Sequence, residues 1–172
     1  RELLDHIAQS GLVDMIDVEI FKDFTYEELA DDRTPEVKER FENLKQWIES
    51  LRQRVVVVGS YHNFDRTPED AELKERLQII DESGVDIPKM AVMPANRLDV
   101  MRLMMFTLQM AEQMDKPLIT MSMSRIGSIS RISGEAFGSA VTFGSIGQES
   151  APGQLPVNKL EEMLDMIHQN YQ

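Results

Sequence analysis

A lysine in the segment DIPKMAVMP, residues 86–94, is a charged amine among apolar neighbours. If the segment forms one strand, Lys89 shares a face with Ile87 and Ala91, because side chains alternate along a strand. Burial disfavours the charged form of a lysine and lowers its pKa, and a neutral amine condenses with ketones to a Schiff base. The alternative is that the strand begins later and Lys89 extends its amine to the surface.

A histidine follows directly after the apolar run VVVVGSY, residues 55–61. Active sites of parallel α/β proteins gather at the carboxyl ends of strands, and His62 occupies such an end. Its imidazole is suited to proton transfer near neutral pH. The commoner role for a single histidine at such a place is that of a hydrogen-bonded loop residue.

Two acidic residues, Asp17 and Glu19, share one face of the segment LVDMIDVEI, residues 12–20. Acidic groups inside a fold need partners, which Lys89 or His62 could supply. The alternative is that the two carboxylates lie at the solvated end of their strand.

Further polar residues with a potential role in binding lie near the carboxyl terminus. Arg125 and Arg131 flank IGSIS, and Arg131 could hold a carboxylate with its planar guanidinium, although a surface position is commoner. The glycine-rich segment FGSIGQESAPGQ predicts a mobile loop in which Ser150 and Gln154 offer neutral hydrogen bonds. No phosphate-binding or dinucleotide-binding glycine motif is present, and histidine spacing gives no metal site. We therefore expect neither cofactor nor metal.

These residues require a framework of alternating strands and helices. The pattern predicts strands over residues 12–20, 54–61, 87–94, 117–123 and 139–144. It predicts helices over 34–51, 67–84, 97–114, 128–138 and 158–170, with Thr34 and Thr67 as N-caps, Pro35 and Pro68 as first helical residues, and an amphipathic stretch that ends at Gly11. Residues 22–33 are expected as a loop or a short helical excursion. Such alternation indicates an α/β fold with a parallel sheet, either an open sheet of five strands or part of an eight-stranded barrel.

The composition is typical of a single globular domain over residues 1–172, with 42% hydrophobic and 28% charged residues. The net charge of −12 disfavours nucleic acid and anionic membranes as partners. No apolar run approaches the ~20 residues of a membrane span, no signal peptide is evident and cysteine is absent. We therefore expect a cytoplasmic protein.

Six segments together resemble the type I 3-dehydroquinate dehydratases, the Schiff-base enzymes of the shikimate pathway. In chain order these segments are SGLVDMID, SYHNFDRTP, DIPKMAVMP, ITMSM, ISRISGEAFGSAVTFG and SAPGQ. The resemblance implies a (β/α)₈ barrel, of which the five predicted strands correspond to the fourth to eighth. The chain would then be a partial barrel of five βα units. Residues 22–54 look longer and more acidic than that family's pattern.

The resemblance also implies a role for each matching residue. Lys89 corresponds to the lysine that forms an imine with the ketone of 3-dehydroquinate, and His62 to the general acid and base. Arg131 corresponds to the arginine that binds the substrate carboxylate. The remaining matches are the closing-loop residues Ser150 and Gln154 and the supporting acidic pair Asp17 and Glu19.

Three alternatives stay open for a chain that corresponds to five of eight strands. It could be one part of a longer lyase. It could form a homo-oligomer in which two or more copies complete a sheet or barrel. It could also be a half-length relative of impaired or no activity that acts as a binding or interaction protein. A fourth hypothesis, with less support, is an aldolase that uses the same lysine on another carbonyl substrate.

Overall fold

The computed structural model describes residues 1–171 of the chain, with side chains described through residue 169. Its strands are β1 (Met15–Glu19), β2 (Val56–Asn63), β3 (Ile87–Val92) and β4 (Ile119–Ser122), in the sheet order β1-β2-β3-β4. The α-helices are α1 (Glu2–Ser10), α2 (Tyr26–Ala30), α3 (Pro35–Arg52), α4 (Asp70–Glu82), α5 (Arg97–Gln113), α6 (Ser128–Ile132), α7 (Gly134–Phe137) and α8 (Val157–Tyr171). Two short 3₁₀ helices are η1 (Ile20–Lys22) and η2 (Arg125–Gly127). The α/β class is confirmed.

The chain divides into two compact units. Unit 1 contains Arg1–Tyr61 and Ala71–Lys89, whereas unit 2 contains His62–Asp70 and the chain from Met90 onward. The single domain expected over residues 1–172 stays a prediction. No helix in the described part of the chain is long and apolar enough to cross a membrane.

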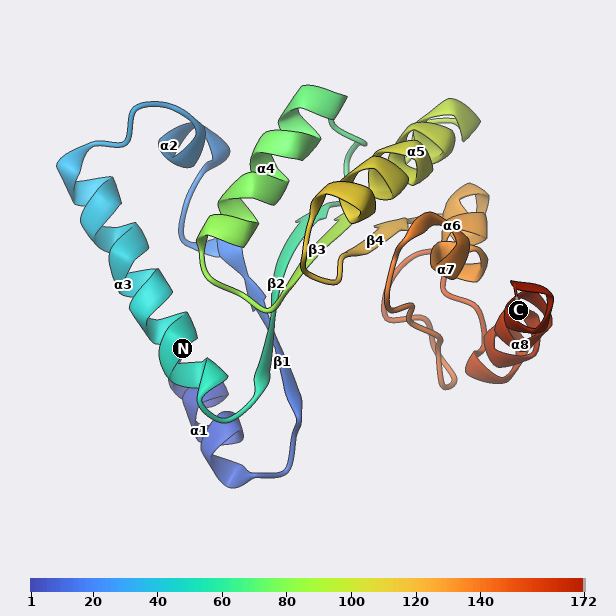
Figure 1. The fold of residues 1–172 in the computed structure, drawn as a ribbon, viewed down its shortest axis with the longest axis horizontal. Helices are drawn as coiled ribbons and strands as arrows, with labels where there is room; N and C mark the ends of the chain where they lie inside the picture. The colour runs from blue at the N-terminus through green and yellow to red at the C-terminus, as the bar shows by residue number, and fades with distance from the viewer. Residues whose placement is uncertain (172) are drawn as a thin grey trace. The chain divides into compact units, whose positions relative to one another are not determined.

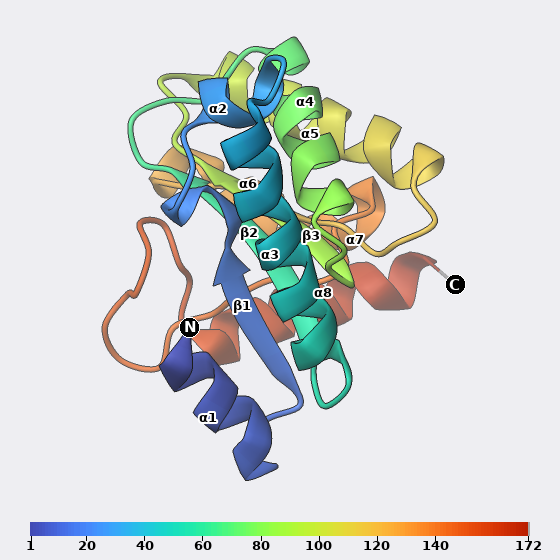
Figure 2. The same ribbon diagram turned by 90° about the vertical axis from the view of Figure 1, so that its left-hand side faces the viewer.

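In unit 1, strand β1 pairs with β2 in parallel, and α3 and α4 lie on the same side of these strands (Figures 1 and 2). Ile16 and Val18 are buried, whereas Asp17 between them points to the other face of β1. Helix α3 begins as predicted, because the hydroxyl of Thr34 accepts a hydrogen bond from the backbone N–H of Val37. Its predicted apolar stripe is buried: Val37, Phe41, Leu44, Ile48 and Leu51.

In unit 2, helices α5 and α6 pack against strand β4, and α6 also contacts α8. A buried pair of hydroxyls joins α5 to β4, with 2.6 Å between the Oγ1 atoms of Thr107 and Thr120. Met123, the residue after β4, donates its backbone N–H to the carbonyl of Val92 at the end of β3, at 2.8 Å. These contacts fix the segment from which α6 departs.

Three predictions about elements are wrong in detail. Residues 139–144 form no strand. Among the described residues their backbone pairs with the β4 region at one bridge, Leu118 to Ser139, and the last backbone hydrogen bond there runs from the N–H of Ala140 to the carbonyl of Leu118 at 2.8 Å. An extended segment without further ladder partners is not a strand. Thr67 caps no helix, because its hydroxyl donates to the carbonyl of Met93 at 3.1 Å and α4 begins at Asp70. The helix expected over 128–138 is split into α6 and α7 at Ser133.

Candidate active site

The amine of Lys89 lies inside unit 1, on a strand whose six residues are all buried. The residue itself is 7% exposed, so the alternative of a lysine that reaches the surface is wrong. Its Nζ lies 2.6 Å from Oδ2 of Asp17, which forms a hydrogen-bonded ion pair between β3 and β1. A buried amine that is ion-paired to a carboxylate is a chemically distinct group within this unit.

A serine that the sequence analysis left without a role connects the acidic pair. The parallel register sets Glu19 opposite Ser60, and Ser60 is buried. Its hydroxyl donates to Oδ1 of Asp17 and lies 3.4 Å from Oε2 of Glu19. Polar contacts therefore run from Glu19 through Ser60 and Asp17 to Lys89. The signal available in the sequence was the position of Ser60 in a buried strand, on the same face as His62.

His62 lies within β2, because this strand continues two residues beyond its predicted end. The imidazole is half-buried, and its ring stacks on that of Phe64 with 6.2 Å between centroids and an interplanar angle of 13°. The loop that follows is held by Arg102 of α5, whose Nη2 donates to the carbonyl of Pro68 at 2.8 Å and to Oδ1 of Asp70 at 3.0 Å. This anchoring restrains the segment that carries the histidine.

Arg131 lies on α6 and is 1% exposed, which excludes the alternative of a surface arginine. Its Nη1 donates to the sulfur of Met121 and its Nη2 to the carbonyl of Pro152, both at 3.4 Å, while Nε finds no partner among the described residues. Burial lowers the pKa of Arg131, and the nearby carboxylate of Glu149 acts in the opposite direction. A buried guanidinium with weak acceptors and a vacant donor is suited to binding an anion.

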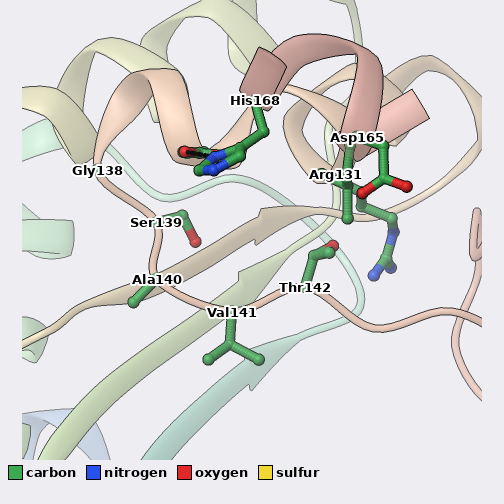
Figure 3. A pocket seen from close by; sticks show the side chains of 11 residues that line it. Arg131, Gly138, Ser139, Ala140, Val141, Thr142, Asp165 and His168 are labelled. Carbon is green, nitrogen blue, oxygen red and sulfur yellow. Dashed lines mark hydrogen bonds and ion pairs between the residues drawn. The ribbon is translucent and has the colours of Figure 1, made fainter. Parts of the chain in front are cut away.

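Arg131 also lines a cavity of about 720 Å³ in unit 2 (Figure 3). Helix α8 contributes Asp165 and His168 to its wall, and the segment after α7 contributes Ser139 and Thr142. The imidazole Nδ1 of His168 lies 2.7 Å from Oε1 of Glu135, so these two residues pair with one another at the wall. The volume is within the range of small-molecule sites.

The predicted loop residues Ser150 and Gln154 lie together. Oε1 of Gln154 accepts hydrogen bonds from the backbone N–H of Ser150 at 2.8 Å and from its hydroxyl at 3.1 Å. Gly153 donates its N–H to Oε2 of Glu149 at 3.1 Å. Because Arg131 donates to the carbonyl of Pro152, the guanidinium and this loop belong to one network.

The loop is held against Ser124, a non-glycine residue with φ of +60°. The N–H of Ser124 donates to the carbonyl of Pro152 at 3.1 Å, and its own carbonyl oxygen lies against Gly153. Gly153 has φ of +80°, and a Cβ there would lie 2.1 Å from that oxygen. Glycine is therefore required at residue 153 for both backbone conformation and space.

Replacing Gly153 with alanine is expected to detach the loop from Ser124, because left-handed strain of about 1–3 kcal/mol adds to a backbone clash. Amide hydrogen exchange over residues 149–154 should become faster. Gly147→Ala is the matched control, since Gly147 has φ of +88° and open space around it. Equal exchange in the two variants would show that contact with Ser124 does not hold the loop.

The structure groups the predicted residues in two sets. Unit 1 brings together Lys89, Asp17 and Glu19, and adds Ser60. Unit 2 holds His62 and a network of Arg131 with the loop of Ser150 and Gln154. Among the described residues, no group of three or more histidine or acidic side chains could hold a metal ion.

Parallel strands separated by helices, with a buried lysine on β3 ion-paired to a carboxylate on β1, define an α/β protein that holds an amine in its interior. The chain belongs to the type I 3-dehydroquinase family, whose family model matches residues 1–171.

Similar proteins agree with this assignment. The chain is 41% identical over 171 residues to a 3-dehydroquinate dehydratase of Listeria welshimeri, which covers 99% of this chain and 61% of the relative. It is 45% identical over 163 residues to that of Salmonella paratyphi B, which covers 94% of this chain and 58% of the relative. The chain thus spans about three fifths of the length of these relatives.

Solved structures give the same result. A type I 3-dehydroquinate dehydratase from Clostridium difficile with covalent modified comenic acid has a TM-score of 0.82 at 38% identity, covering 98% of this chain and 61% of that one. The 3-dehydroquinate dehydratase of Geobacillus kaustophilus has a TM-score of 0.81 at 33% identity, covering 99% and 60%.

Proposed function

We propose that this chain carries the chemistry of a 3-dehydroquinate dehydratase, a hydro-lyase that converts 3-dehydroquinate to 3-dehydroshikimate in the shikimate pathway. The observation that carries the proposal is the buried amine of Lys89, held at 2.6 Å by Asp17 in a chain of this family. An amine in such a place is the group that a Schiff-base mechanism requires. The mechanism would need neither metal nor cofactor.

In this mechanism Lys89 gives a proton to the carboxylate of Asp17, its partner in the ion pair, and the neutral amine attacks the C3 ketone of the substrate. Loss of water then leaves a protonated imine. The imine draws electrons from the adjacent carbon and acidifies the C2 proton. His62 removes that proton and returns it to the C1 hydroxyl as this group leaves as water. Hydrolysis of the imine then releases 3-dehydroshikimate and restores the amine of Lys89.

The other predicted residues would bind the substrate or support the lysine. Arg131, with its unpartnered Nε and two weak acceptors, would bind the substrate carboxylate. Ser150 and Gln154 would exchange the hydrogen bonds between them for bonds to the substrate. Asp17 and Glu19 would orient the amine of Lys89, with Ser60 joining their carboxylates.

We further propose that strands β1 to β4 and the segment from Ser139 occupy five of the eight strand positions of a (β/α)₈ barrel. The sequential strand order β1-β2-β3-β4 supports this view. Met15 and Val56, neighbours in the β1–β2 register, are 44% and 38% exposed. Because a barrel fills its interior with side chains, further strands would cover this apolar surface. They would come from a longer polypeptide or from a second copy, and a strict monomer in light scattering would exclude the second source.

The composition supports the remaining parts of the proposal. The net charge of −12 favours a small-molecule substrate over nucleic acid or a membrane surface, with Arg131 as the local cation for an anionic substrate. A cytoplasmic location belongs to the same proposal.

The proposal is tested by trapping the imine. The protein is incubated with 3-dehydroquinate and reduced with borohydride, and its intact mass is then measured by mass spectrometry. Turnover is followed separately by the absorbance of 3-dehydroshikimate. A covalent adduct with turnover supports the dehydratase. An adduct without turnover supports the half-length relative of impaired activity, and a folded protein that forms no adduct would refute the role of Lys89.

Replacing His62 with alanine is expected to lower turnover by about 10²–10⁴-fold, the usual contribution of a placed proton-transfer group. The borohydride-trapped adduct should still form, because Lys89 supplies its nucleophile. Phe64→Ala is the control, since it removes the ring that stacks on the imidazole and leaves the imidazole in place. Turnover of His62→Ala within a few-fold of wild type would contradict the proton-transfer role.

A further inference from the structure

Helix α4 carries a buried arginine that lies among three aromatic rings of unit 1. The guanidinium carbon of Arg76 is 5.0 Å from the ring centroid of Phe21, 4.2 Å from that of Tyr26 and 4.3 Å from that of Tyr61. Its Nε and Nη2 lie 2.8 and 2.7 Å from Oε1 of Glu72 on the same helix. We call these three rings the aromatic box. A buried cation against several ring faces is a strong and directional contact.

The aromatic box joins the end of β1 to the second half of β2, the two strands that carry the polar contacts of Lys89. Phe21 lies two residues after Glu19 of β1, and Tyr61 directly follows Ser60 of β2. The two rings also meet edge to face, with 5.3 Å between their centroids at an angle of 67°.

The third ring of the aromatic box connects the box to the acidic segment after β1. Tyr26 lies on α2, and its hydroxyl donates to the carboxylate of Glu75, the residue before Arg76. This hydrogen bond raises the pKa of Tyr26 to about 12, so the hydroxyl stays protonated at neutral pH. Helix α4 thus contacts the segment after β1 through Arg76, which lies over the rings of Phe21 and Tyr26, and through Glu75, which accepts the hydrogen bond of Tyr26.

We propose that Arg76 is a positioning residue for the reaction at Lys89, an inference that rests on the proposed function. The geometry is that of a clamp: Arg76 contacts Phe21 and Tyr61, and these residues fix the strand segments that bear Glu19 and Ser60. Ser60 in turn bonds Asp17, whose other oxygen holds the amine of Lys89. A displacement of these two strand segments by about 1 Å would misplace the amine of Lys89 and slow the chemical step.

A second arginine of unit 1 provides a matched control. Arg33 lies 4.4 Å from the ring centroid of Phe41 on α3 and forms an ion pair of 2.7 Å with Glu82 on α4. Arg33 therefore has both a contact with an aromatic ring and an ion pair with a carboxylate, as Arg76 does. None of its described contacts is with Phe21 or Tyr61 or with a neighbour of Ser60.

The experiment compares Arg76→Met, Arg76→Lys and Arg33→Met in the full chain. Under saturating 3-dehydroquinate, Arg76→Met is expected to slow turnover by about 10–100-fold with KM changed less than about 3-fold, the effect of a misplaced reacting group. Arg76→Lys, which keeps the charge over the rings, should recover part of the rate. Arg33→Met should keep the wild-type kcat even if it lowers Tm as much as Arg76→Met does.

Hydrogen exchange of the free protein separates this inference from the proposed function. Arg76→Met should speed amide exchange at Glu19, Ser60 and Tyr61, whereas Arg33→Met should not. If wild type forms no adduct yet exchange changes as expected, the dehydratase proposal fails and the clamp stands. If wild type is active and Arg76→Met behaves like Arg33→Met in both measurements, the clamp is refuted.

Discussion

Replacing Lys89 with methionine is expected to abolish the borohydride-trapped adduct and turnover together. Methionine keeps an unbranched side chain in the buried strand but removes the amine that the proposed mechanism uses as its nucleophile. The variant should stay folded, because Asp17 is 41% exposed and its carboxylate can turn to water when its partner is lost. The measurements are intact mass after reduction, the absorbance of 3-dehydroshikimate and thermal unfolding.

Lys74→Met is the control for Lys89, since Lys74 lies exposed on α4 in the same unit. This variant should form the adduct as wild type does. An adduct of unchanged mass and yield in Lys89→Met would place the imine on another lysine and overturn the assignment. Loss of the adduct in both variants would point to a general effect on the fold, which the unfolding curves would reveal.

Replacing Arg131 with methionine is expected to weaken substrate binding by about 30–1,000-fold, which corresponds to about 2–4 kcal/mol for a charge-assisted pair of hydrogen bonds. Stability should move little or rise, because the variant removes a buried charge whose Nε has no partner among the described residues. The signature is thus a loss of affinity without a loss of Tm. Titration with 3-dehydroquinate and thermal unfolding measure the two quantities.

Arg125→Met is the control for Arg131, because Arg125 lies on the neighbouring η2 helix and is exposed. It should change neither affinity nor Tm. If Arg131→Met bound substrate as wild type does, the carboxylate would be held elsewhere. If it unfolded, the guanidinium would instead be a structural group, and Arg131→Lys would show whether its charge alone suffices.

A local sequence signal predicted the start of a helix only where no tertiary contact competed with it. The same Thr-Pro-Glu pattern occurs at residues 34–36 and 67–69, but only Thr34 caps the helix that follows. Thr67 bonds instead to the carbonyl of Met93, far away in the chain. A tertiary contact overrode the local signal, and a pattern within a few residues contains no information about such a contact.

The candidate site was predictable to a similar extent. The alternation around Lys89 left burial and exposure both open, and the place of β3 between β2 and β4 in the sheet decided for burial. Ser60 gained a role only through the β1–β2 register, which a single sequence does not specify. The segment 139–144 has a strand-like pattern, but strand formation depends on a partner beyond Ala140. The functional roles themselves came from the resemblance and stay predictions.

If Arg131 binds the substrate carboxylate as proposed, its incomplete hydrogen bonding couples the ligand to the folding equilibrium. Folding has already buried this cation and held it in place, so the cost of desolvating and ordering it is not incurred again when an anion arrives. A small carboxylic acid that binds the folded chain alone raises its apparent stability in proportion to the logarithm of its concentration above Kd. A thermal-shift screen of carboxylic acids could therefore map the specificity of this subsite without any turnover.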